Sequence, residues 1–74
     1  MNNKRRTRLQ EAVSYIEDSL KILYQAKDEE QDGLDNFPEN LQNSEQYNNM
    51  EEAIDTIEDS ISDLEQTVEN LGNL

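Results

Sequence analysis

The strongest constraint on the fold is an unbroken heptad spacing of large apolar residues in the second half of the chain. Between positions 47 and 71 these residues are separated alternately by three and four positions. They are Tyr47, Met50, Ile54, Ile57, Ile61, Leu64, Val68 and Leu71. This spacing places one apolar seam along a helix, at the a and d positions of a heptad labelled a to g. It predicts a helix over about residues 46–71 that packs against other helices.

The first half of the chain carries the same spacing. Its seam residues are Leu9, Val13, Ile16, Leu20 and Leu23. Small residues occupy the g positions beside both seams, which widens the buried stripe and lets two backbones approach closely. These are Ala12, Ser19 and Ala26 in the first half and Ala53, Ser60 and Thr67 in the second. We predict an all-α antiparallel hairpin of one domain, residues 1–74, with a first helix over about 5–31 and a loop over about 32–45.

Composition favours an oligomer of this hairpin. Only 32% of the 74 residues are hydrophobic and none is cysteine, so the core of one hairpin would be thin and no disulfide could reinforce it. Tyr15, Ile22 and Tyr24 lie off the seam of the first helix, where a lone hairpin would leave much of their surface wet. The alternative is that scattered exposed apolar residues are ordinary. We predict a homodimer, a four-helix bundle in which the first helix is the more central one.

The predicted loop is long for a helical hairpin, and its residues indicate how its ends are made. Gly33 is a natural residue to follow the first helix, and the second could be capped by Ser44 or by one of the asparagines at 48–49. Leu34, Phe37 and Leu41 are expected to fold back over the open end of the hairpin. We therefore expect either a short helical insertion or a functional element here.

A calcium loop is one candidate for that element. Residues 28–39 place oxygen-bearing side chains and Gly33 at the spacing of a calcium-binding helix–loop–helix. The candidate ligands are Asp28, Glu30, Asp32, Asn36 and Glu39. Asp35 stands where an aliphatic residue normally packs, and a chain this acidic produces partial matches easily. We favour an ordinary acidic helix end with a glycine cap, and expect no metal and no cofactor.

Enzymatic chemistry is poorly supported, because the chain has neither histidine nor cysteine and so lacks the usual general base and the best nucleophile. Carboxylates abound, but catalysis requires one whose pKa is raised in an apolar pocket. No apolar run approaches the length of a membrane span. No apolar segment follows the basic residues of the N-terminus, so we do not expect this segment to be a signal peptide. We expect a non-enzymatic protein of the cytoplasm.

Charge is divided unevenly along the chain, whose net charge is −12. All six basic residues precede position 28, and the rest of the chain holds only acidic ones. A basic cluster opens the first helix, at Lys4, Arg5, Arg6 and Arg8. An antiparallel hairpin would bring this cluster to the end of the second helix, near Glu65 and Glu69, where cations are favourable. We favour this pairing over phosphate binding, including binding of a signalling nucleotide.

The second helix carries an acidic outer face with no lysine or arginine. Its predicted partner-binding residues are Glu51, Asp55, Glu58, Asp59, Asp63 and Glu65, flanked by Glu52 and Glu69. These eight charges span about 27 Å at 1.5 Å rise per residue. That is one charge per about 3.5 Å along the helix, close to the charge spacing of about 3.4 Å in one DNA strand. Such a face would attract a protein groove built for nucleic acid and would repel nucleic acid itself. The alternative is that the acidic bias only keeps the protein dissolved.

Residues 37–65 resemble small acidic helical-hairpin proteins encoded by phages and prophages of Gram-positive bacteria. The resemblance lies in a Phe-Pro-Glu-x-Leu-Gln-x-Ser-Glu turn, at residues 37–39, 41–42 and 44–45, and in the heptads from Met50 to Ile57. It implies a phage origin and supplies no activity. With the acidic face, it leads us to predict an inhibitor that binds a host-encoded defence or nucleic-acid-binding protein. A structural or assembly protein is the alternative.

Overall fold

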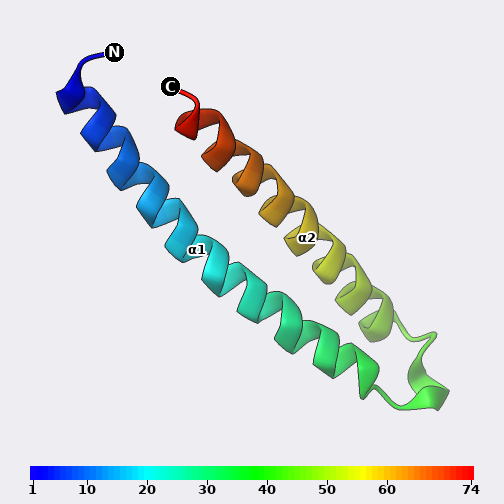
Figure 1. Ribbon diagram of the computed structural model, residues 1–74. Helices are drawn as coiled ribbons and strands as arrows, with labels where there is room; N and C mark the ends of the chain where they lie inside the picture. The colour runs from blue at the N-terminus through cyan, green and yellow to red at the C-terminus, as the bar shows by residue number, and fades with distance from the viewer.

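The chain forms two long antiparallel helices joined by a short connection. A computed structural model describes all of residues 1–74. Helix α1 spans Asn3–Asp35, a 3-10 turn η1 spans Glu39–Leu41, and α2 spans Glu45–Gly72. Figure 1 shows the two helices running side by side with both chain ends at the same end of the rod. The predicted all-α hairpin is therefore confirmed.

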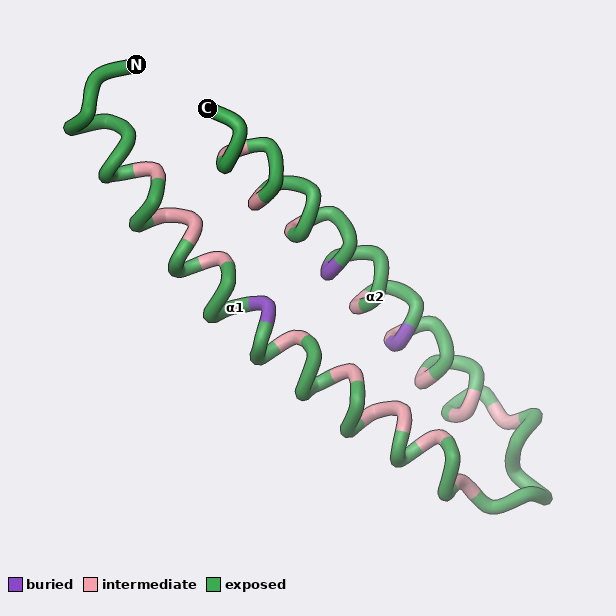
Figure 2. Tube along the Cα trace, in the orientation of Figure 1, coloured by how far each residue is buried: buried purple, intermediate pink, exposed green.

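The rod is thin, and its core follows the predicted seam. Its principal extents are 59 × 15 × 13 Å, and residues facing the other helix alternate with exposed ones along both helices (Figure 2). Only Leu20, Ile54 and Ile61 are buried, and all three occupy a positions. The remaining seam residues are half-buried, namely Leu9, Val13, Ile16, Leu23, Tyr47, Met50, Ile57, Leu64, Val68 and Leu71. One helix can cover only one side of the other, so the seam is narrow.

Helix α1 starts and ends outside its predicted bounds. The side chain of Asn2 accepts a hydrogen bond from the Arg5 N–H at 2.8 Å, which caps the helix and starts it at Asn3 rather than near residue 5. At the other end the helix runs to Asp35, four residues beyond the prediction. The Asn36 side chain donates to the Asp32 carbonyl at 2.9 Å, and Pro38 disfavours helical backbone at the residue before it. The connection is therefore only residues 36–44.

The longer α1 overturns the predicted glycine cap and gives a helical conformation to most of the candidate calcium loop. Gly33 does not follow the helix but lies inside it, with an ordinary negative φ. Four of the six residues proposed for the calcium loop, up to Gly33, are likewise helical. A calcium loop must wrap its oxygen ligands around the ion, whereas a helix directs successive side chains 100° apart. No group of three or more acidic side chains in the structure is arranged to hold a metal ion.

The connection and the start of α2 match the sequence more closely. Ser44 caps α2, and its Oγ accepts a hydrogen bond from the Tyr47 N–H at 3.2 Å. The half-buried ring of Phe37 meets Tyr47 edge-on, with 5.5 Å between ring centroids. Leu41 does not join this cluster and is 46% exposed. The end of the hairpin is thus covered by Phe37, with a 3-10 turn as the short helical insertion.

Candidate partner-binding surface

The predicted acidic face lies on the side of α2 that is turned away from the seam. All six predicted residues are exposed, as are the flanking Glu52 and Glu69. Because Ile54 and Ile61 are the most buried residues of the helix, the side chains opposite them, including Asp59 and Asp63, form its outermost ridge. Glu51, Asp55 and Glu58 lie between this ridge and the seam. The structure therefore keeps the six residues on one continuous surface.

No cation of the chain neutralises this face. The two ion pairs of the molecule both lie within α1, between Lys21 and Asp18 and between Lys27 and Asp28, each at 3.8 Å. The carboxylates of α2 make no ion pair: α2 has no basic residue of its own, and none of the cations of α1 pairs with it. The negative potential of α2 is thus available to an external partner.

Glu65 differs from its neighbours on this face. Its Oε2 accepts a hydrogen bond from the Tyr24 hydroxyl of α1 at 3.0 Å. This bond, aided by desolvation and by the charge of Glu65, raises the pKa of Tyr24 above its ordinary value. Glu65 therefore also holds the two helices together. Sequence reasoning treated Tyr24 only as an off-seam apolar residue, although both residues occupy e positions, which face each other in an antiparallel pair.

The basic cluster of α1 meets the end of α2 through one residue only. Arg6 donates from Nη1 to the main-chain oxygen of Leu74 at 2.5 Å. A cation at this position is favoured by the dipole of α2, whose C-terminal end is negative. Lys4, Arg5 and Arg8 form no ion pair, and neither does Glu69. The cluster therefore reaches the end of α2 through Arg6, but the expected pairing with Glu65 and Glu69 does not form, because Glu65 bonds to Tyr24 instead. Lys4, Arg5 and Arg8 remain without an ionic partner at this end of the rod.

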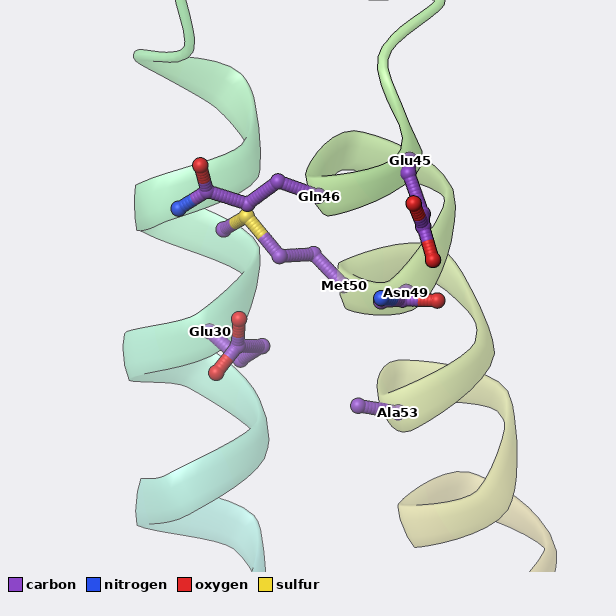
Figure 3. A pocket seen from close by; sticks show the side chains of 6 residues that line it. All are labelled: Glu30, Glu45, Gln46, Asn49, Met50 and Ala53. Carbon is purple, nitrogen blue, oxygen red and sulfur yellow. The ribbon is translucent and has the colours of Figure 1, made fainter.

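A polar hollow lies between the helices near the connection. Figure 3 shows Met50 and Gln46 reaching from α2 toward α1, with Glu30 of α1 directed back at them. The lining is completed by Glu45, Asn49 and Ala53. The hollow combines an apolar floor with two carboxylates and two amides, which suits the stem and head of a lysine or arginine side chain. Glu30 occupies a d position, so the seam of α1 becomes polar here, a signal that was readable in the sequence.

Neither the surface nor the hollow contains a nucleophile paired with a base. No helix has a stretch apolar and long enough to cross a membrane. Comparisons of the chain with protein-family profiles, curated protein sequences and solved structures find no match.

Proposed function

We propose that this chain is a non-enzymatic protein-binding protein whose acidic α2 face occupies the basic, nucleic-acid-binding groove of a host protein and inhibits it. The main observation behind this proposal is that eight exposed carboxylates line α2 and that none of them forms an ion pair with a cation of the chain. A helix stabilised for its own sake would gain from lysines four residues away from its glutamates. Leaving out every such lysine preserves a strong field for a cationic partner.

The spacing of these charges supports nucleic-acid mimicry. The eight carboxylates follow one another along a nearly straight helix, over about 27 Å at 1.5 Å per residue. A groove that binds phosphates about 3.4 Å apart along one strand would meet carboxylates at a similar linear density. We further propose a phage origin, action in the host cytoplasm, and a homodimer as the active form.

The test uses a host nucleic-acid-binding protein captured from lysate on the immobilised chain and then purified. We expect its binding to weaken steeply with salt and to be competed by double-stranded DNA. Replacing Asp55, Glu58 and Asp59 by Asn, Gln and Asn should raise the Kd about tenfold or more, at about 0.5–1 kcal/mol per contact.

The matched control removes an equal number of negative charges from α1, by neutralising Glu11, Glu17 and Asp18. It should leave the Kd within a few-fold of the parent value. Equal losses in both triple variants, or binding that DNA does not compete, would contradict mimicry.

The alternative is an assembly protein whose acidity only prevents aggregation. The thin core supports it, because three buried residues are few for a chain of 74. An assembly protein would bind its partner through apolar surface, so its affinity would change little with salt or with the α2 substitutions. The same titration therefore separates the two functions.

A further inference from the structure

The hairpin has two unlike sides. Tyr24 and Glu65 both occupy e positions and bond across the hairpin, so the e flanks of both helices meet on one side and the g flanks on the other. The e side carries Glu51, Glu58 and Glu65 of α2. The g side carries few charges and includes Tyr15 and Ile22 of α1, each 65% exposed.

The g side of α1 is self-complementary about the point between residues 18 and 19. Tyr15 and Ile22 are equidistant from this point, as are Arg8 and Glu29, and Arg5 and Asp32. None of these four charged residues forms an ion pair within the chain. Ser19 and Ala26 lie among them, small enough for two helices to approach closely.

From this pattern we infer that a second copy of the chain docks on this face, with the two α1 helices antiparallel and the two-fold axis passing between residues 18 and 19. Tyr15 of each copy then packs on Ile22 of the other, and Arg8 lies opposite Glu29. Such an interface is isologous, as two-fold symmetry requires. The inference rests on the homodimer proposed above and is independent of what the α2 face binds.

The solvent-exposed area of the single chain is consistent with an interface to a second copy. The single chain exposes 5758 Å², whereas a compact monomer of this mass exposes about 4,700 Å². The excess of about 1,100 Å² is comparable to the roughly 800 Å² that each partner buries in a standard interface. Covering Tyr15 and Ile22 would supply apolar burial that the three-residue core lacks.

The distribution of charge favours the g side of α1 as the interface and an antiparallel arrangement of the two α1 helices. With a net charge of −12 per chain, two copies repel unless they meet where acidic residues are sparse. Antiparallel α1 helices bring the basic start of each copy to the acidic end of the other, whereas parallel helices would align arginine with arginine. The one carboxylate near the axis, Asp18, already has Lys21 at 3.8 Å. The open hollow at Glu30 lies beside the place where the second copy's Arg5 would arrive.

Single cysteines test the register, because the chain has none of its own. In the proposed dimer the two copies of residue 19 lie close together, while the two copies of residue 12 are about 20 Å apart along the helices at 1.5 Å per residue. We expect Ser19→Cys to form a disulfide dimer readily under mild oxidation and Ala12→Cys not to do so. Ala12→Cys mixed with Ala26→Cys should cross-link. Self-cross-linking of Ala12→Cys, or none at Ser19→Cys, would overturn the register.

A charge exchange provides an independent test, with dimer affinity measured by sedimentation equilibrium and helicity checked by circular dichroism. Arg8→Glu alone and Glu29→Arg alone should each raise the dimer Kd about tenfold or more. The double variant should return it to within about threefold. Failure of this rescue overturns the Arg8–Glu29 pairing.

The wild-type mass separates this inference from the proposed function. A mass of twice 8.6 kDa supports the homodimer, and Tyr15→Glu should then give monomers while Ser14→Glu, on the opposite flank, should not. A wild-type monomer overturns both the homodimer and this interface. A wild-type dimer with the wrong cross-linking pattern overturns the interface alone. Binding through Asp55, Glu58 and Asp59 is measured separately in either case.

Discussion

At the scale of single residues, the bond from Tyr24 to Glu65 is the only hydrogen bond that joins a side chain of α1 to a side chain of α2. A neutral tyrosine can donate this bond and a tyrosinate cannot, which is why the contact raises the pKa of Tyr24. A raised pKa means that folding favours the protonated form. The contact therefore stabilises the hairpin below the ordinary tyrosine pKa of about 10, and this stabilisation is lost as the pH rises through the folded value.

This predicts a late-titrating component in the tyrosinate absorbance of the folded protein. The component should disappear in Tyr24→Phe, and in Glu65→Gln it should move toward the ordinary pKa, because the charge and the ionic acceptor are both removed. Glu58→Gln is the matched control, since Glu58 occupies the same heptad position one repeat earlier. An unchanged titration in Glu65→Gln would contradict the assignment.

At the scale of the helix, Gly33 is a weak point rather than a terminus. It sits inside α1 with a negative φ, so its conformational freedom serves no turn there. The nearest atom to an added Cβ is the terminal methyl of Met50, at 3.2 Å, and that flexible side chain can move by a few tenths of an ångström.

Gly33→Ala should therefore stabilise the hairpin by about 0.5–1 kcal/mol through helix propensity, seen as a rise of a few degrees in Tm. Gly72→Ala is the control, because nothing lies within 4 Å of its added Cβ and the last residue of α2 contributes less. A fall in Tm for Gly33→Ala would show that Met50 cannot yield. It would also reopen a role for Gly33 in a turn.

The helices themselves were predictable because their signals are local. The three–four spacing of apolar residues is present whatever the rest of the chain does, and the Ser44 cap needs only the N–H of Tyr47 three residues later. The end of α1 was missed because Gly33 suggested a stop. Leu34, half-buried in the continuing seam, and the Asn36 side chain at the Asp32 carbonyl outweigh that signal. The acidic face was readable for the same reason as the seam, but the role of Glu65 between the helices was not.

At the scale of the whole molecule, charge opposes stability. The carboxylates of α2 repel one another at i,i+4 separations, as at Glu51, Asp55 and Asp59, and no cation intervenes. We therefore predict that Tm rises with added salt, which screens this repulsion.

Asp55→Lys tests the same point from the other direction, because it turns two repulsive spacings into attractive ones. It should raise the stability by roughly 0.5–1 kcal/mol and reduce the salt dependence of Tm, while weakening partner binding. Asp55→Asn is the matched control, because it removes the repulsion without adding an attraction, and it should give a smaller gain in stability. A stability that is indifferent to salt in the parent chain would contradict this account.

The sequence alone determined the two helices, their seams and the lysine-free outer face, since each depends on spacing within one helix. It narrowed the cap of α2 to Ser44 or an asparagine at 48–49, and the structure selects Ser44. The tertiary structure decided where α1 ends, that Arg6 alone reaches the end of α2, and that Glu65 bonds to Tyr24. A heptad seam is unchanged when one helix slides by a repeat along the other, so periodicity cannot set the offset between helices. That offset is set by the length of the connection and by packing around Leu20, Ile54 and Ile61, and it decides which distant side chains meet.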